Sequence, residues 1–345
     1  MRAVVLEQFG GVENFSLQDL PIPEPKAGEV RVRLKAAGFN PVDFKMRHGS
    51  YGGNLPVVLG ADFSGVVDRV NGPHTGFVVG DQVYGMAFGP CSNGSYAEYL
   101  CVPAAFIVKK PPEISFAQAA ALPVAALTAY RAMASSGAMK KGDAIFIAGA
   151  GGGVGSFAIR LAQAMGITAI YTVAGSVESA QFLVQKLGLD PKNIIEYQGM
   201  SQRELKEQLL SLHGGKLFDA TFDFVGGEMK RLCLEVTALS GHFATIVPED
   251  EELNLPLWQR GHSMGFGKSL SLHFIFVGAE AFGGSPASWD VYQRHLRHLT
   301  LFIAKKQLQL PPSQVIGHLS LETVSEAHRL LEAGRVKGKL VMEIP

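Results

Sequence analysis

DAIFIAGAGGGVGSFAIRL, residues 143–161, is the stretch that decides the fold of this chain. Residues 144–148 are a short apolar run of strand-forming residues, and five glycines follow this run within seven positions. Apolar side chains then recur at positions 157, 159 and 161, in a segment that we expect to be helical. A strand, a glycine-rich turn and a helix in this order predict a βα unit that binds phosphate.

The turn reads Ala150-x-Gly152-x-x-Gly155, which is a dinucleotide fingerprint with alanine in place of the first glycine. Gly152 lets the backbone approach a pyrophosphate, and Gly155 lets the helix pack closely on its strand. The N–H groups of this loop, with Gly153 and Val154 in its middle, then face the phosphates together with the positive end of the helix dipole. A glycine turn with a purely structural role is the alternative interpretation.

The composition narrows the class of protein. A chain of 345 residues exceeds the usual limit of a single core, so we expect two domains. Lys+Arg and Asp+Glu both number 31, and this balance disfavours nucleic acid or an anionic membrane surface as a partner. Three cysteines without a CxxC motif, and no apolar run of about 18 residues, favour a reduced, cytoplasmic compartment and no membrane span.

The segment before the glycine turn is rich in β-type patterns. Residues 1–117 contain short strand-like runs separated by Gly, Pro, Asn and Asp, at 3–6, 30–36, 65–70, 82–84 and 96–102. Their spacing predicts a partly open β-barrel rather than βαβ units. Three prolines at positions 21, 23 and 25 indicate an extended connector.

From about residue 118 the pattern alternates between strands and helices. A helix over 117–135, broken near Pro123, is followed by strands expected at 144–148, 169–173, 194–197, 219–224, 242–247 and 272–277. Six strands separated by helices or long crossovers predict an α/β fold with a doubly wound parallel sheet of the Rossmann type. We expect one long amphipathic helix over 288–306, and strands at 316 and 340–344 that return to the first domain.

The second strand of this sheet bears on the choice of cofactor. An NAD-preferring fold carries an acid at its end, about 20 residues past the glycines, whereas this chain has Ala174-Gly175-Ser176 there. Ser176 and the Gly175 amide are suited to a 2′-phosphate, which favours NADP over NAD. Glu178 lies just beyond and stands against that choice. Ser176 also has a simpler interpretation as the cap of the following helix.

A catalytic zinc ion needs three protein ligands and an open position. The spacing of Cys91 and Cys101 fits no zinc pattern, so we expect no metal. Segment 36–51, AAGFNPVDFKMRHGSY, instead gathers polar side chains after a strand, and Asn40-Pro41 forces a turn there. Turn chemistry and an active site are both consistent with this segment.

The chain as a whole resembles the zinc-free quinone oxidoreductase branch of the medium-chain dehydrogenase/reductase superfamily. The resemblance runs nearly from end to end and rests on AAGFNPVDFKMRHGSY, LPVVLGADFSGVV, VGDQVYGM, GSYAEYLCVP, ALPVAALTAYRAM, AGAGGGVG, FDATFDFVGGE and VKGKLVMEIP. Zinc-dependent relatives carry a metal-binding Cys at the position of Asn40, and their GHE motif is Gly60-Ala61-Asp62 here. Two zinc ligands are therefore missing.

The resemblance also implies an architecture and site residues. A GroES-like catalytic domain would comprise residues 1–117 and 279–345, and a Rossmann domain residues 118–278. The expected catalytic residues are Asn40, Asp43 and Tyr51, with Asp43 supporting the turn. The expected cofactor-binding residues are Thr128, Gly152, Gly153, Val154, Gly155, Ser176, Tyr197 and Arg335.

The function expected from these residues is an NADPH-dependent, zinc-independent reductase that transfers hydride to a quinone or an α,β-unsaturated carbonyl. The family also implies a homodimer, which would pair through the sixth strand of the parallel sheet. Two alternatives remain open: a non-catalytic NADPH-binding sensor or RNA-binding protein, and a zinc-type alcohol dehydrogenase. The neutral charge disfavours the first, and the missing ligands disfavour the second.

Overall fold

The computed structural model describes the chain except for residues 73–74, 88–92, 136, 138, 249–254 and 260–262. Its contacts divide the chain into two compact units. Unit 1 comprises Met1–Leu127, Val277–Gln307 and Ser313–Pro345, and unit 2 comprises Thr128–Phe276 and Leu308–Pro312. Residues 118–127, which the sequence assigns to the Rossmann domain, fall in unit 1 by this criterion.

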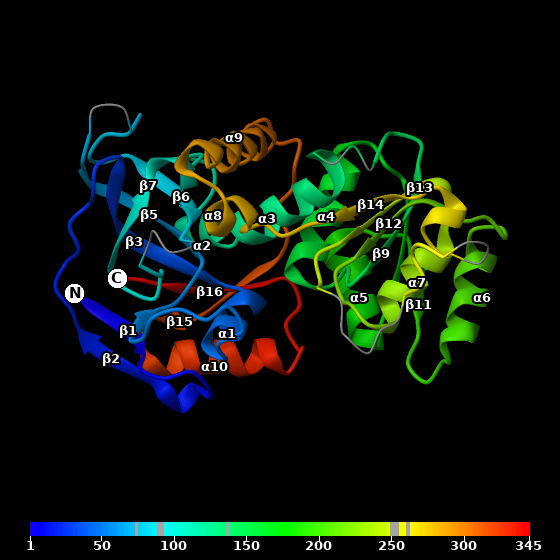
Figure 1. Ribbon diagram of the computed structural model, residues 1–345, viewed down its shortest axis with the longest axis horizontal. Helices are drawn as coiled ribbons and strands as arrows, with labels where there is room; N and C mark the ends of the chain where they lie inside the picture. The colour runs from blue at the N-terminus through cyan, green and yellow to red at the C-terminus, as the bar shows by residue number, and fades with distance from the viewer. Residues whose placement is uncertain (73–74, 88–92, 136, 138, 249–254, 260–262) are drawn as a thin grey trace. The chain divides into compact units, whose positions relative to one another are not determined.

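Unit 2 is built on a six-stranded parallel sheet (Figure 1). The strands are β9 (Ala144–Ala148), β10 (Ala169–Ala174), β11 (Ile194–Glu196), β12 (Phe218–Asp223), β13 (Thr237–Thr245) and β14 (Ser271–Phe274). Their order is β11-β10-β9-β12-β13-β14, so the chain starts at the centre, winds to one edge and then to the other. The predicted doubly wound parallel sheet is confirmed, and its switch point lies at β9 and β12.

The crossover helices cover this sheet. They are α4 (Gly153–Ala164), α5 (Val177–Leu187), α6 (Gln202–Leu212) and α7 (Glu228–Val236). α4 packs beside α5, and α6 packs beside α7. Because the crossovers are right-handed and the winding direction reverses after β11, the two pairs form two separate layers. A cluster of buried hydrophobic residues between this sheet and its helices includes Phe146, Leu209, Phe218 and Leu232.

Unit 2 differs from the sequence prediction at the end of α7. The sequence predicts a helix through residue 238 and a strand from 242, whereas β13 begins at Thr237, directly after the helix. The Thr237 hydroxyl donates to the carbonyl of Cys233 at 2.6 Å and also contacts the Thr221 hydroxyl at 2.7 Å. A β-branched residue that bonds the carbonyl one turn earlier disfavours further helix, so the chain turns into the sheet at once.

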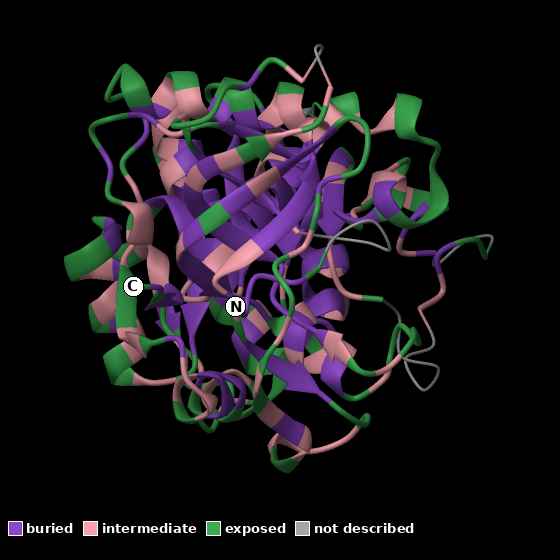
Figure 2. Ribbon diagram, turned by 90° about the vertical axis from the view of Figure 1, so that its left-hand side faces the viewer, coloured by how far each residue is buried: buried purple, intermediate pink, exposed green. Residues whose placement is uncertain are grey.

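Unit 1 is built on two sheets that are mainly antiparallel, with β15 and β16 as a parallel pair. A three-stranded sheet has the order β2 (Phe15–Asp19), β1 (Arg2–Leu6), β4 (Val57–Val58). The larger sheet contains β3 (Glu29–Phe39), β5 (Asp62–Val70), β6 (Gln82–Met86), β7 (Tyr99–Pro103), β8 (Ile107–Lys109), β15 (Ser313–His318) and β16 (Lys339–Glu343). Figure 2 shows buried residues gathered in the sheets and most exposed residues on the surrounding helices and loops. β15 is an exception, because none of its residues is buried.

The long strand β3 connects distant parts of the sequence. Along one edge it pairs with β5, and along the other with β7 at its start and β16 at its end. β16 pairs antiparallel with residues 36–39, so the C-terminal strand returns to the first sheet as predicted. The return places Lys339, the first residue of β16, beside the end of β3, which leads directly into the Asn40 turn.

The remaining helices lie around these sheets. They are α1 (Pro41–Arg47), α2 (Phe116–Ala120), α3 (Pro123–Tyr130), α8 (Ala279–Gly283), α9 (Asp290–Ala304) and α10 (Leu321–Glu332). A π-helical segment covers Arg131–Ser135, and short 3-10 turns cover Val12–Asn14, Ala104–Phe106, Pro191–Asn193, Phe266–Lys268 and Pro286–Ser288. The predicted break near Pro123 and the long helix near the C-terminus are confirmed. In the described part of the chain, no helix has the length and apolarity to cross a bilayer.

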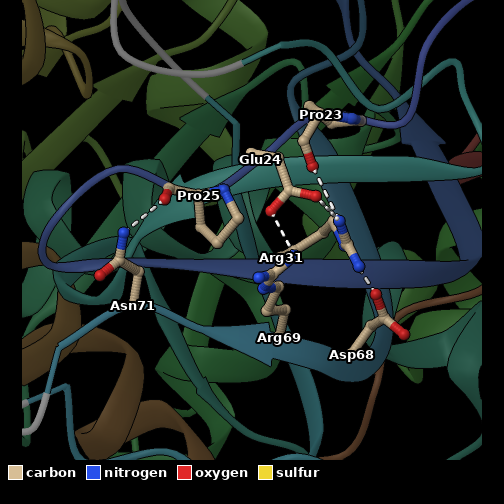
Figure 3. A network of polar contacts seen from close by, with 7 residues as sticks. All are labelled: Pro23, Glu24, Pro25, Arg31, Asp68, Arg69 and Asn71. Carbon is tan, nitrogen blue, oxygen red and sulfur yellow. Dashed lines mark hydrogen bonds and ion pairs between the residues drawn. The ribbon is translucent and has the colours of Figure 1, made fainter.

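The proline-rich connector is fastened to the large sheet by charged side chains (Figure 3). Arg31 on β3 donates to the Pro23 carbonyl at 3.1 Å and to the Glu24 carboxylate at 3.0 Å. Arg31 also pairs with Asp68 at 2.6 Å, and Arg69 pairs with Glu24. These groups surround an exposed strand surface, and the connector follows it because backbone and side-chain acceptors both bind the same guanidinium.

Candidate functional site

The glycine loop of unit 2 has the geometry of a phosphate-binding turn. Gly152 is the N-cap of α4, with extended backbone and no side-chain cap. The N–H groups of the first helical turn have no partner within the helix, and here no side chain takes their place at the cap. Residues 151–154 are partly exposed, and within the loop the Gly152 amide donates to the Gly149 carbonyl at 3.2 Å. The amides of the helical turn that follows Gly152 are therefore the ones that face outward for a ligand.

Gly155 is required by packing rather than by backbone conformation. A Cβ at this position would lie 2.1 Å from the Gly149 carbonyl oxygen and 2.6 Å from the Ala150 Cα. A Cβ at Gly151, by contrast, would meet no atom within 4 Å. The loop therefore presses α4 against β9 through Gly155 and leaves open space at Gly151, as a bound diphosphate requires.

The end of β10 brings three predicted residues together. Ser176 is the N-cap of α5, where its hydroxyl accepts from the Ser179 amide at 3.2 Å. The Tyr197 hydroxyl lies against Gly175, so close that a Cβ there would meet it at 3.3 Å. Ser176 thus serves as a cap, and Tyr197 reaches the same strand end. Glu178 is exposed one residue into the helix.

Two predicted cofactor residues lie elsewhere. Thr128 is buried in α3 and is the first residue of unit 2. Arg335 is exposed in the connection between α10 and β16, in unit 1. Their expected roles toward a cofactor stay predictions.

The Asn40 turn of unit 1 contains a buried ionic network. The Lys339 ammonium donates to the Phe39 carbonyl at 2.9 Å, to the Asn40 side-chain oxygen, and to the Asp62 carboxylate at 3.1 Å. The Asn40 Nδ2 donates to the same Asp62 oxygen at 2.9 Å. The other Asp62 oxygen accepts from the Val124 amide at 2.8 Å, in the first turn of α3. Asn40 and Lys339 are each 3% exposed and Asp62 is 0% exposed.

The groups around Asp62 determine its charge state. Burial raises the pKa of Asp62, while the Lys339 ammonium and the hydrogen bonds from Asn40 and Val124 lower it. Every one of these partners donates, and a protonated carboxyl would find no acceptor among them. The network is therefore complementary to a carboxylate paired with an ammonium.

Asp43 lies in the same region, on α1. Its carboxylate accepts from the Asn40 backbone amide at 2.7 Å, which begins the helix and holds the turn as predicted. Burial raises the pKa of Asp43 to about 7; the Asn40 amide opposes this rise, the negative charge of Asp62 adds to it, and Lys339 opposes it. Asp43 is fully buried, so it supports the turn from inside.

A second set of buried polar residues connects α1 with α10. The Tyr96 hydroxyl lies 3.2 Å from His328 Nε2, and burial together with the charges of Arg47 and His48 lowers the pKa of His328 to about 3. His328 is therefore neutral near pH 7. Arg47 is almost completely buried and pairs with Glu332 at the end of α10. These contacts fix α1 from the side opposite to its first turn.

Tyr51 lies apart from this network. It is 43% exposed and stacks on Phe282 of α8, with ring centroids 6.2 Å apart and an interplanar angle of 20°. Partial burial raises the pKa of its hydroxyl, so the phenol stays protonated near pH 7. Unit 1 thus brings Asn40 and Asp43 together and places Tyr51 on a separate aromatic surface.

The residues at the Asn40 turn do not fit a zinc ion. Zinc requires thiolate, imidazole or carboxylate ligands, whereas Asn40, Ala61 and the Lys339 ammonium stand there. No group of three or more His, Cys, Asp or Glu suited to a metal is found among the residues that the structure describes. Cys91 lies outside those residues. Burial raises the pKa of Cys101 to about 12, which keeps it a thiol.

Comparison with known proteins agrees with this architecture. Residues 26–112 match the family model of the alcohol dehydrogenase GroES-like domain, and residues 192–342 match that of the zinc-binding dehydrogenase. A zinc-type alcohol dehydrogenase-like protein of Staphylococcus aureus is 30% identical over 341 residues, which cover 96% of this chain and 95% of the relative. The quinone oxidoreductase of Coxiella burnetii has a TM-score of 0.79 and 29% identity, covering 100% of this chain and 99% of that structure.

This chain belongs to the medium-chain dehydrogenase/reductase superfamily of oxidoreductases, in its quinone oxidoreductase branch. The quinone oxidoreductase of Homo sapiens is 36% identical over 188 residues, which cover 54% of this chain and 56% of the relative. The chain thus spans about half the length of the curated relatives that it matches first. The predicted family and the GroES-like and Rossmann folds are confirmed.

Sequence reasoning missed two residues of this medium-chain dehydrogenase/reductase chain. Lys339 was part of a motif used only for resemblance, although a lysine inside the apolar run GKLVMEI is a signal of a buried partner. Phe282 carried no signal, because nothing in the sequence pairs residue 282 with residue 51. In the sequence Asp62 is only the last residue of the Gly60-Ala61-Asp62 motif, and the structure gives it an ammonium partner.

Proposed function

We propose that the protein is an NADPH-dependent, zinc-independent reductase that transfers hydride to a quinone or an α,β-unsaturated carbonyl. The glycine loop carries this proposal, because Gly155 closes the helix onto the strand while the first turn of α4, from Gly153, lacks a side-chain cap and is partly exposed. The loop lies at the switch point of a doubly wound sheet, where such folds bind dinucleotides. The similarity to quinone oxidoreductases supports the choice of substrate class.

The residues of unit 2 would hold the cofactor. The amides of Gly153, Val154 and Gly155 would bind the diphosphate, and Gly152, whose own amide donates to the Gly149 carbonyl, would let the backbone approach it. Ser176 with Tyr197 would receive the 2′-phosphate of NADP. When bound, the dinucleotide supplies a hydride to an electron-poor carbon conjugated with a carbonyl. Thr128 and Arg335 remain proposed contacts to the same cofactor.

The residues of unit 1 would act on the substrate. Negative charge develops on the carbonyl oxygen as the hydride arrives, and a positioned hydrogen-bond donor lowers that barrier by about 3–4 kcal/mol, or about 10²–10³ in rate. Asn40 offers an amide N–H and Tyr51 a protonated phenol. The stacked pair of Tyr51 and Phe282 would also contact a flat conjugated ring.

Two experiments test this function. NADPH is expected to raise the melting temperature more than NADH at matched concentration, because at equal concentration the tighter ligand adds more stability by mass action. Equal shifts would remove the preference for NADP. The variant Tyr51→Phe is expected to lower enone turnover about 10²-fold while the NADPH dissociation constant stays unchanged. Unchanged turnover would remove Tyr51 from the chemistry.

A homodimer through β14 is part of the proposal. β14 is the edge strand of the parallel sheet, and Phe274 at its end is 60% exposed, so backbone groups and an apolar side chain are both available to a second copy. Analytical ultracentrifugation should show a dimer that Phe274→Asp weakens. A monomeric wild-type protein would contradict it.

A further inference from the structure

The contacts of Lys339 are complete. An ammonium group has three N–H donors, and here they meet three acceptors: the Phe39 carbonyl, the Asn40 amide oxygen and the Asp62 carboxylate. The side chain is 3% exposed and holds one position in the interior. Lys339 therefore has no donor left for a substrate, and any influence on the reaction passes through its partners.

The same contacts fix the orientation of the Asn40 amide. An ammonium can only donate, so the oxygen of Asn40 must face Lys339, and a carboxylate can only accept, so the nitrogen must face Asp62. A flipped amide would place two donors together and two acceptors together. The oxygen accepts from Lys339 and one Nδ2 hydrogen is donated to Asp62, and among the described residues Nδ2 donates to no second acceptor. The second Nδ2 hydrogen of Asn40 can therefore still be donated to a ligand.

The ammonium also strengthens this donor. The Lys339 ammonium, hydrogen-bonded to the amide oxygen, draws electron density from the amide nitrogen and makes its N–H groups better donors. Hydrogen bonds that form a chain polarise one another in this way where the dielectric constant is low. The pair of Lys339 and Asp62 gains little net stability, because desolvation of two buried charges offsets their attraction. Stability alone is therefore a weak reason for this ion pair.

We infer that Lys339 is a positioning residue whose ammonium orients and polarises the Asn40 amide as the hydrogen-bond donor to the substrate carbonyl oxygen. The geometry that carries this inference is the closed ring of Lys339, Asn40 and Asp62. The ammonium acts on the substrate only through the Asn40 amide. The inference rests on the proposed function and assigns the role of Asn40 within it.

The test is a double-mutant cycle with 9,10-phenanthrenequinone and NADPH. Asn40→Ala is expected to lower kcat about 10²-fold, and Lys339→Met about 10- to 100-fold, because a misplaced donor loses most of its effect. The variant that combines both is expected to be no slower than Asn40→Ala alone. Multiplied losses in the combined variant would show that Lys339 does not act through Asn40.

Controls separate positioning from folding. Lys337→Met alters an exposed lysine two residues away and should leave kcat and the melting temperature unchanged. Asp62→Asn/Lys339→Met removes both buried charges, so it should recover stability lost in Lys339→Met without recovering kcat. Recovery of kcat along with stability would reduce Lys339 to a structural residue. In every variant the NADPH dissociation constant should match that of the wild type.

The outcomes distinguish the two proposals. A wild-type protein that reduces neither quinones nor enones contradicts the proposed function itself. An active wild type with multiplied losses contradicts only the role of Lys339. Side-chain amide NMR adds a readout without turnover: the Asn40 Nδ2 protons should move upfield in Lys339→Met, and unmoved signals would contradict polarisation by the ammonium.

Discussion

The two units of the chain hold their candidate sites in different ways. In unit 2 the phosphate loop is made by consecutive residues, and its key contact joins Gly155 to Gly149 over six positions. In unit 1 the Asn40 turn is held by Lys339 and Asp62, which are 299 and 22 positions away along the chain. The first site follows from local backbone chemistry, whereas the second exists only when strands β3, β5 and β16 are paired.

This difference teaches which mutations each site tolerates. The loop of unit 2 depends on shape, because its glycines have no side chain and so allow α4 to pack closely on the backbone of the loop. The turn of unit 1 depends on charge balance among buried side chains, where an unpaired group is costly. Substitutions of equal size are therefore expected to harm the two sites for different reasons.

Asp62→Asn is expected to have the largest effect. It keeps the volume and an acceptor but leaves the Lys339 ammonium buried without its counter-charge, which costs about 3–5 kcal/mol of unfolding free energy. The matched control is Asp68→Asn, which removes a carboxylate that pairs with Arg31 at the half-exposed network of Figure 3. That loss should stay below about 1 kcal/mol. Urea denaturation measures both, and equal losses would contradict the contrast between buried and exposed charge.

Gly155→Ala tests the shape of the other site. Its Cβ would lie 2.1 Å from the Gly149 carbonyl oxygen, so helix and strand must separate, at about 1–3 kcal/mol and with loss of NADPH affinity. Gly151→Ala adds the same methyl group where no atom lies within 4 Å, and its unfolding free energy should change by less than about 0.5 kcal/mol. Thermal unfolding compares the two variants. A stable Gly155→Ala protein would contradict the close packing of α4 on β9.

Asp43 makes the stability of unit 1 depend on pH. Its pKa is about 7 when folded and about 3.8 when unfolded, so the folded state binds more protons between these values and stability falls as pH rises from about 4 to 7. Asp62, Lys339 and Tyr96 are the charged and titratable groups that face it. As the pH rises from 5 to 8, the free energy of unfolding of Asp43→Asn should therefore increase by about 2 kcal/mol relative to that of the wild type.

The comparison with Asp43→Asn is needed because His328 acts in the opposite sense. Its pKa is about 3 when folded, below the ordinary 6.5, so its contribution to stability is lost as pH falls through that window. The difference between wild type and Asp43→Asn cancels this contribution. A difference that does not change with pH would show that the Asp43 carboxyl titrates normally.

Ser176→Ala should have the smallest effect on folding. It removes the cap bond to the Ser179 amide and costs about 1 kcal/mol. Ser176→Gly should cost only a few tenths of that amount, because glycine is itself an acceptable cap. If Ser176 also binds the 2′-phosphate, both variants lose affinity for NADPH and not for NADH. Titration calorimetry distinguishes this from a cap alone, which would leave the NADPH affinity unchanged.

Structural features that depend on a few neighbouring residues were predicted well from the sequence. The strand at 144–148 matches β9 residue for residue, because the run is too short for a typical helix, contains strand-forming residues and is followed by glycines. The turn at Asn40-Pro41 was expected, yet the structure continues it as helix α1, because Pro41 suits the first helical position and Asp43 binds the Asn40 amide. The short strands β2, β4 and β8 were missed, because such short segments become strands only through pairing with neighbouring strands in space.

The sequence by itself determined the parallel sheet, the glycine loop and the absence of an acid at the end of β10, because periodicity and glycine content act over a few residues. Only the tertiary structure decided that a lysine near the C-terminus would neutralise Asp62 and orient Asn40. Buried charges must find partners in space, and strand pairing rather than sequence distance sets which charges meet. The partner of the Asn40 turn was therefore visible only once β16 lay beside β3.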